Sequence, residues 1–279
     1  MKLLQLCLVS SLLLISPLAK SQSDLEINGA IGIASYYGDL VQSDHAFFTQ
    51  PSYAISVGAA HYFSPHWSIR GDFSLLQVKA ADSKNKRADL VARNLSFKSN
   101  VWDISVAGQY DVFDLTAGEK TVTPYVFLGV GFFHYNPYTT DRNGNKVYLQ
   151  LEKTEGQGLA AYPDRKPYKL TQLQLPFGLG VKYALNENIV LALELKYRYI
   201  DTDYLDDVSE AYPEKAYLDA RDPTTARLTW RADELPGGAP YPAKVGNLAR
   251  GNPDNNDSYY TFQAKFTWRL KSNKIQINY

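Results

Sequence analysis

The chain has 279 residues, of which 45% are hydrophobic and 13% aromatic, and its 29 basic side chains equal its 29 acidic ones in number. This balance gives no reason to expect a nucleic-acid partner, and a single cysteine excludes a disulfide framework. Beyond residue 21, no segment has the roughly 18 consecutive apolar residues of a membrane-spanning helix.

The N-terminus predicts export from the cytoplasm. Lys2 gives a positively charged start, residues 3–15 form an apolar run, and residues 19–21 have a small-residue cleavage pattern. These features in this order are typical of a secretory signal peptide, which we place at residues 1–21. Cys7 lies inside it, so the mature chain would have no thiol.

Eight runs of alternating residues follow the signal peptide. Successive side chains of a strand point to opposite faces, so each run has one apolar face. The runs lie at residues 25–37, 53–63, 67–77, 101–112, 123–135, 173–183, 189–199 and 260–270. Each reaches the roughly 9–11 residues that a tilted strand needs to cross a bilayer. The hairpin at 173–199 is the clearest, with apolar odd positions and mostly small or charged even positions.

Two folds are compatible with this alternation. In a soluble sandwich the apolar faces would cover a core, whereas in an outer-membrane barrel they would face lipid and the polar faces would line the lumen. The lengths of the connections favour the barrel, because short and long ones alternate strictly. The short ones are near Ser64-Pro65, 114–120 and 186–188, and the long ones are 38–52, 78–100, 136–171 and 201–257. Outer-membrane barrels have short periplasmic turns and long extracellular loops.

We therefore predict an all-β fold, an eight-stranded antiparallel transmembrane β-barrel in the outer membrane of a Gram-negative cell. The barrel domain would span residues 22–270, and residues 271–279 would form a C-terminal periplasmic tail. An even number of strands leaves both termini on the periplasmic side.

Charged residues of both signs lie on the faces that we assign to the lumen. They are Arg70, Asp72, Asp103, Lys182, Glu194, Lys196 and Arg198. The interior of an eight-stranded barrel is just wide enough for side chains to fill. We therefore expect a plugged core in which each buried charge has a partner. The alternative is that these residues line a small selective pore.

An acidic run, DTDYLDDVS at 201–209, opens the longest loop. Its carboxylates Asp201, Asp203, Asp206 and Asp207 are the ligands that a hard cation such as calcium prefers. Their spacing lacks the glycine and the final glutamate of the calcium-binding helix-loop-helix hand. We therefore expect a solvated or arginine-paired loop edge, and we predict no metal and no cofactor.

No catalytic site is predicted. A nucleophile–base pair at the extracellular rim would need His45 or His134 beside a serine and a carboxylate. Ser43 and Asp44 precede His45, but adjacency in sequence is poor evidence for the geometry of a triad. The chain has no G-x-S-x-G motif. A surface enzyme is therefore the weakest of the functional alternatives.

An ordered set of short strings is more specific than the periodicity. It comprises SYYGDL at 35–40, RNLSF at 93–97, PYVFLGVG at 124–131, NP at 136–137, TEGQG at 154–158, PFG at 176–178, DTDYLDDVS at 201–209, and RG at 250–251 before Asp257. With this set the chain resembles the PorG-like family of outer-membrane barrels associated with type IX secretion. The resemblance covers nearly the whole mature chain. Asp103 departs from it, because a glutamate would be expected there, and residues 271–279 run beyond the last strand.

The resemblance implies a non-catalytic subunit of a protein-export machine, without a cofactor, a small-molecule substrate or a nucleic-acid partner. Such a subunit would lie in outer-membrane lipid and contact the ring-forming periplasmic lipoproteins that carry cargo toward the cell surface. A small passive channel is the main alternative. The residues of the long loops that carry the family motif are Thr154, Glu155, Gly156, Gln157, Gly158, Asp203, Tyr204, Asp206 and Asp207.

Overall fold

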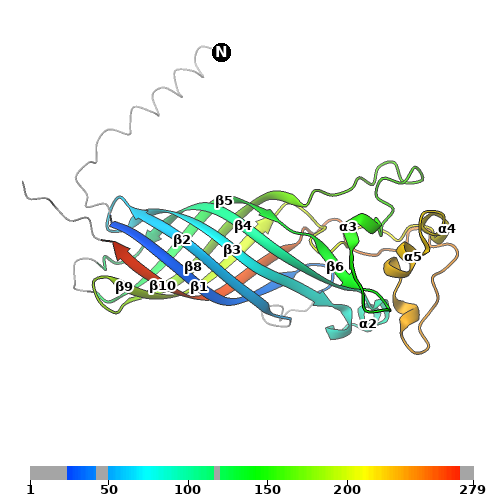
Figure 1. Cartoon of the computed structure of the whole chain (residues 1–279), viewed down its shortest axis with the longest axis horizontal. Coiled ribbons are helices and arrows are strands. Elements are labelled where there is room, and N and C mark those ends of the chain that lie inside the picture. Colours follow the sequence, from blue (N-terminus) through cyan, green and yellow to red (C-terminus); the bar gives the residue numbers. More distant parts are fainter. Residues whose placement is uncertain (1–23, 42–49, 116–119, 271–279) are drawn as a thin grey trace, which may run out of the picture.

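The computed structural model describes residues 24–41, 50–115 and 120–270. Its long strands are β1 Asp24–Tyr37, β2 Ser52–Tyr62, β3 Trp67–Ala81, β4 Ser96–Asp111, β5 Val122–His134, β8 Thr171–Ala184, β9 Ile189–Ile200 and β10 Ser258–Leu270. Each is antiparallel to the next along the chain, and β10 pairs back onto β1. This closure leaves no long strand with a free edge. The prediction of an eight-stranded antiparallel barrel is confirmed (Figure 1).

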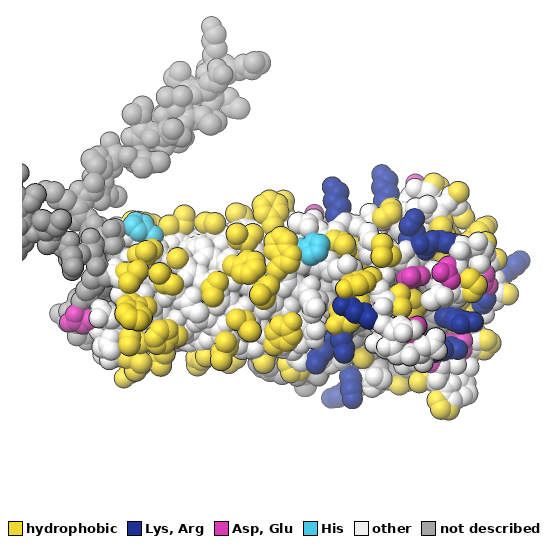
Figure 2. All heavy atoms as spheres, viewed as in Figure 1, with side chains coloured by type: hydrophobic (Ala, Val, Ile, Leu, Met, Phe, Trp, Pro, Cys, Tyr) yellow, Lys and Arg dark blue, Asp and Glu magenta, His cyan; other side chains and the backbone are white. Residues whose placement is uncertain are grey.

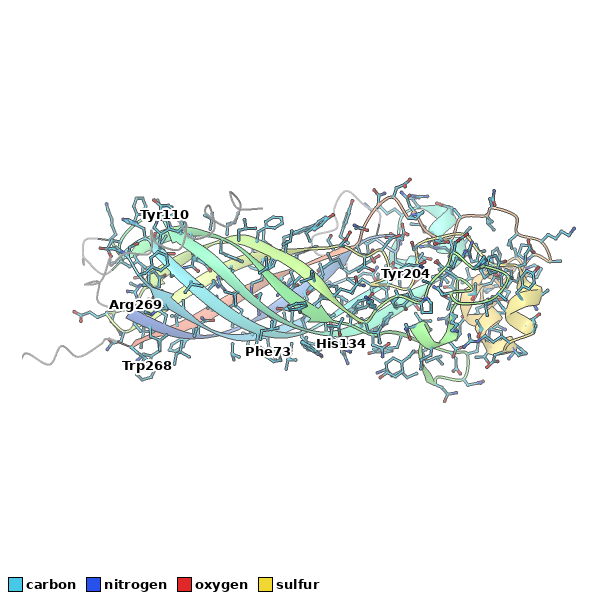
Figure 3. All side chains as sticks on the ribbon, turned by 90° about the horizontal axis from the view of Figure 1, so that it is seen from above. Phe73, Tyr110, His134, Tyr204, Trp268 and Arg269 are labelled. Atoms are coloured by element: carbon cyan, nitrogen blue, oxygen red, sulfur yellow. The ribbon has the colours of Figure 1, made fainter. Side chains whose placement is uncertain are left out.

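The outer wall of the barrel is apolar, whereas its interior is polar. Ile31 and Leu128, for example, are 67% and 65% exposed. Figure 2 shows hydrophobic side chains over the visible face of the barrel, and Figure 3 shows Phe73 on its outside. A closed barrel with such a wall has its backbone hydrogen bonds satisfied and its apolar side chains suited to lipid. The chain is therefore an outer-membrane barrel. No helix in the described residues is long and apolar enough to cross a membrane.

The two ends of the barrel differ, as the lengths of the connections predict. The short turns, the start of β1 and the end of β10 lie at one end of the barrel, and the long loops form a folded cap at the other (Figure 1). The cap contains η2 Asp82–Lys84, α2 Ala88–Arg93, β6 Pro137–Thr140, β7 Lys146–Tyr148, α3 Leu149–Glu152, α4 Lys215–Asp219, α5 Pro223–Thr229 and η3 Ala232–Glu234. By the usual orientation of such barrels, the cap is extracellular. The predicted signal peptide at 1–21, the tail at 271–279, and His45 lie outside the described residues.

Strands β3 and β4 are longer than predicted. The prediction ended the first at residue 77 and began the second at 101, whereas their pairing continues to Ala81 opposite Ser96. The additional residues, 78–81 of β3 and 96–100 of β4, extend the two strands toward the cap. Their inward side chains, including Val78 and Phe97, are buried in a hydrophobic cluster at the junction of barrel and cap. Burial of these side chains stabilises the extension.

Aromatic side chains fill part of the lumen below this cluster. Tyr125 and Phe127 point inward from β5 and are almost fully buried. Gly178 and Gly180 on β8 give them room. A Cβ atom at Gly178 would lie 2.6 Å from the Phe127 ring, and one at Gly180 would lie 2.5 Å from the Tyr125 ring. The rest of the lumen is lined by charged and neutral polar side chains.

Candidate functional site: the lumen network and the cap junction

The structure places all seven predicted lumen residues inside the barrel, and none is more than 5% exposed. At mid-height Arg70 of β3 contacts two carboxylates, Glu194 at 2.7 Å and Asp72 at 2.9 Å. Glu194 also accepts from Lys265 at 3.0 Å and from the Tyr125 hydroxyl at 2.7 Å. Each of these buried charges therefore has a partner of opposite sign, as its stability requires.

Two further levels of ion pairs close the lumen above and below. Arg198 and Asp103 form a pair at 2.9 Å toward the cap, both fully buried. Lys196 of β9 joins the middle level through Asp72 at 3.2 Å. Toward the short turns, Lys182 contacts Asp111 at 2.7 Å. Ion pairs therefore lie at three levels along the barrel axis.

Sequence reasoning missed four members of this network. They are Glu26, Asp111, Lys265 and Arg269, which pair with residues inside the lumen. Three of the four alternate with lipid-facing residues on β1 and β10, and that periodicity could have identified them. Asp111 ends β4 between Tyr110 and the exposed Val112, so the alternation of the predicted run at 101–112 could have identified it as well.

In the cap, the TEGQG and DTDYLDDVS strings come together around one buried arginine. Arg250 contacts Glu155 at 2.9 Å and Asp207 at 3.6 Å. The Glu155 carboxylate also accepts from the backbone N–H of Ser209 at 2.9 Å. Asp207 accepts from the Tyr168 hydroxyl at 2.7 Å and from Thr154. Gly156 and Gly158 have φ of +77° and +72°, as expected for the tight turns of TEGQG.

A second group of carboxylates surrounds Tyr36 at the end of β1. The Tyr36 hydroxyl lies 2.5 Å from Asp206 Oδ2 and 3.0 Å from Asp257 Oδ1. The backbone N–H of Leu205 donates to Asp257 at 2.8 Å. Burial, followed by the charges of neighbouring aspartates, raises the pKa of Asp206 and of Asp257 well above the usual range. These two groups therefore favour a protonated state in the folded cap.

The expectation of a solvated or arginine-paired loop edge at 201–209 is only partly correct. Asp201 is exposed and hydrogen-bonded to Asn256, and Asp207 is paired with arginine. Asp203 and Asp206 are buried, however, because the neighbouring loops fold over them. In the described part of the chain, no group of three or more His, Asp or Glu side chains has an arrangement that could hold a metal ion.

Five of the eight strings that carry the family resemblance meet at one place, which we call the cap junction, whereas PYVFLGVG and PFG lie in the barrel strands β5 and β8. Its residues are Tyr36, Asp39, Arg93, Thr154, Glu155, Asp203, Asp206, Asp207, Arg250 and Asp257. Arg93 ties three loops together, because its guanidinium donates to Asp82 at 2.7 Å and to the carbonyl of Asp39 at 3.1 Å, and also to the carbonyl of Arg250. Tyr204, labelled in Figure 3, stacks on Tyr168 with a centroid distance of 4.8 Å. Gln157 is buried, and its side-chain oxygen accepts a hydrogen bond from the backbone N–H of Glu155.

A cavity of about 890 Å³ opens beside the cap junction. Its walls are mostly apolar and include Tyr212, Trp230 and Leu235, with Arg93 on the polar side. Its described lining contains no serine, threonine, cysteine, histidine or lysine. Its carboxylates are those of Asp39 and Asp89, and its hydroxyl is that of Tyr212.

His134, the described candidate base, lies on the outer wall instead. Its Nδ1 is 2.9 Å from Thr171 Oγ1, and its ring stacks on Trp102 with a centroid distance of 5.6 Å. Figure 3 shows His134 at the cap-side end of the barrel. This is the position of an interfacial aromatic girdle.

The buried acidic residues of the cap should make its stability depend on pH. Burial raises the pKa of Asp203 to about 8 and that of Asp207 to about 6, against about 3.9 in an unfolded chain. Between about pH 4 and pH 8 the folded cap therefore binds more protons than the unfolded one, and its stability falls as the pH rises. Hydrogen exchange of residues 201–209 should be slower at pH 5 than at pH 8, after correction for the intrinsic rate. Equal corrected protection at both pH values would contradict this.

No curated protein matches the chain. Among solved structures, Ail of Yersinia pestis is 9% identical with a TM-score of 0.43, over 90% of this chain and 100% of that one. Neisserial surface protein A is 13% identical with a TM-score of 0.43, over 90% and 98% of the two chains. OprG of Pseudomonas aeruginosa is 11% identical with a TM-score of 0.44, over 90% and 97%. A family model described as "Domain of unknown function (DUF6089)" matches residues 5–221. Because this match covers more than half of the sequence, the chain belongs to the DUF6089 family.

Proposed function

We propose that this protein is a non-catalytic outer-membrane subunit of a type IX secretion machine, which anchors or contacts ring-forming periplasmic lipoproteins. The observation that carries the proposal is that five of the eight resemblance strings converge at the cap junction. Strings that lie far apart in sequence, such as those around Tyr36, Glu155 and Arg250, contribute to one bonded unit. Their order along the chain is therefore the signature of one structure, which favours a true relationship to the PorG-like family.

Two further features support a structural rather than a catalytic or conducting role. Ion pairs lie at three levels of the lumen, and the described lining of the cavity beside the cap junction includes no serine, threonine, cysteine, histidine or lysine. The short-turn end of the barrel would face the periplasm and is the natural contact surface for periplasmic rings. Its β8–β9 turn, at residues 185–188, is exposed.

Deletion of the gene tests the proposal. Export of type IX cargo should fall, and expression of the wild-type gene from a plasmid should restore it. Unimpaired export, with normal amounts of the other subunits, would contradict the proposal. A photo-crosslinking amino acid at Asn188 should capture a ring lipoprotein, whereas the same group at Lys244, in the cap, should not.

The alternative of a passive channel has its own test. Planar-bilayer recording of the purified barrel should be silent. Discrete conductance that changes on Glu194→Gln would favour the channel instead, because this carboxylate lies at the centre of the filled lumen.

A further inference from the structure

Two lysines face each other on the outer wall where the barrel meets the cap. Lys79 of β3 and Lys98 of β4 are direct register partners. They alternate with inward residues such as Val78 and Phe97, so both side chains point outward. Like charges directly opposite each other destabilise a strand pair. The placement therefore needs a compensating negative charge.

A third lysine lies beside this pair. Lys98 is also the register partner of Tyr138 in β6, and the ammonium of Lys146 in β7 lies 3.8 Å from the centroid of the Tyr138 ring. A cation over an aromatic face is held in a defined position. Within the described residues, none of the three lysines takes part in an ion pair. No described carboxylate therefore compensates their charge.

The side chains below the lysines form layers along the wall. Gln77 and Asn100 lie one step down and are joined by a hydrogen bond of 2.9 Å. The next step is Leu75 opposite Trp102, and both belong to the exposed apolar wall. In Figure 2, basic side chains project from the molecule beyond the cap-side end of the hydrophobic wall. From cap to barrel the order is cationic, amide, aromatic and aliphatic, which matches a lipid from phosphate to acyl chain.

The other side of the barrel lacks this arrangement. At the same end of β9 and β10 the exposed side chains include Asp201 and Asp254, which are acidic. A general attraction to an anionic membrane surface would favour basic residues all round the rim. The opposed lysines, the third lysine held over Tyr138 and the amide pair below them indicate a defined site on β3, β4 and β7.

We propose that Lys79, Lys98 and Lys146 bind the phosphate groups of an outer-leaflet lipid whose acyl chains lie against Leu75 and Trp102. The phosphate provides the negative charge that the opposed lysines need. The amides of Gln77 and Asn100 contact the polar region between phosphate and acyl chains. The site is independent of the periplasmic role proposed above, because it lies at the opposite end of the barrel.

Native mass spectrometry of the full-length barrel in detergent tests this, with diphosphoryl lipid A as the probe. Wild type should retain the lipid, and Lys79→Gln/Lys98→Gln should bind it more weakly, on the order of tenfold, given the usual contribution of each lysine near an anionic surface. Lys79→Arg/Lys98→Arg should retain binding. The matched control Lys166→Gln/Lys244→Gln removes the same charge from exposed loop positions and should bind as wild type does. Heat-dependent mobility on gels would verify that each variant is folded.

Two comparisons distinguish the lipid from other anions. The same lipid without its phosphates should bind more weakly to wild type, and excess inorganic phosphate should displace little of the phosphorylated lipid. Binding of the dephosphorylated lipid equal to that of the phosphorylated one would overturn the proposal, as would unchanged binding by folded Lys79→Gln/Lys98→Gln. Complete displacement by inorganic phosphate would also overturn it, by indicating a site for free phosphate.

Discussion

Replacing Glu194 by alanine should destabilise the barrel by about 3–5 kcal/mol, the cost of leaving buried charges without their partner. Glu194 is 2% exposed and contacts Arg70 at 2.7 Å and Lys265 at 3.0 Å. It also lies 3.8 Å from Lys196. Its removal leaves three buried cations with Asp72 as their remaining carboxylate at this level. Urea unfolding of the barrel in lipid vesicles, followed by tryptophan fluorescence, measures the change.

Two further variants show whether charge imbalance is the cause. Asp89→Ala breaks the Arg87–Asp89 pair, whose side chains are 52% and 63% exposed, and should destabilise the barrel far less than Glu194→Ala does. Arg70→Met/Glu194→Met removes one charge of each sign and should be more stable than Glu194→Ala. If Glu194→Ala unfolds like Asp89→Ala, the lumen pairs do not determine stability.

The barrel could be predicted from sequence because a strand in a bilayer obeys two strict conditions, alternation and minimum length. The ends of β3 and β4 could not, because Lys79 and Lys98 interrupt the apolar outer face just where the strands leave the membrane. The alternation of buried inward residues continues there with Val78 and Phe97, but the lipid-facing signal stops.

The members of the lumen network were partly predictable, but their pairing was not. Alternation shows which side chains point inward, and the burial of Arg70 and Glu194 follows from it. That these two meet depends on the register of several intervening strand pairs, since they lie 124 positions apart in sequence. A pattern within one strand has no information about that register.

The cap junction was the least predictable part. The acidic run at 201–209 reads as a solvated loop because four carboxylates within seven positions suggest exposure. Its burial depends on Arg250, which lies 43 positions from Asp207 and 95 positions from Glu155. The PorG-like resemblance identified these strings as a set, although it did not show that they touch.

Replacing Arg250 by methionine should open the cap and leave the barrel closed. Arg250 is 3% exposed and compensates both Glu155 and Asp207. Without it, two buried carboxylates lack a cation, which should cost about 3–5 kcal/mol. Limited proteolysis should then cut within 150–165 and 201–215, while heat-dependent gel mobility still reports a folded barrel. Arg221→Met, which removes an exposed arginine bonded to cap carbonyls, should change cleavage little.

Acid should partly restore the cap of Arg250→Met. The guanidinium opposes the effect of burial on the pKa of Asp207, which is raised to about 6, so its loss should raise this pKa further. Between about pH 4 and this raised pKa, Asp207 would be protonated in the folded variant and ionised in the unfolded chain. The stability of the variant would therefore increase as the pH falls. Cleavage at pH 5 should therefore be slower than at pH 8 by more than in wild type, measured with a protease whose activity is calibrated at both values. Cleavage of the variant that is equally fast at both pH values would show that Arg250 acts through packing of its side chain, because lost packing is not recovered by a proton.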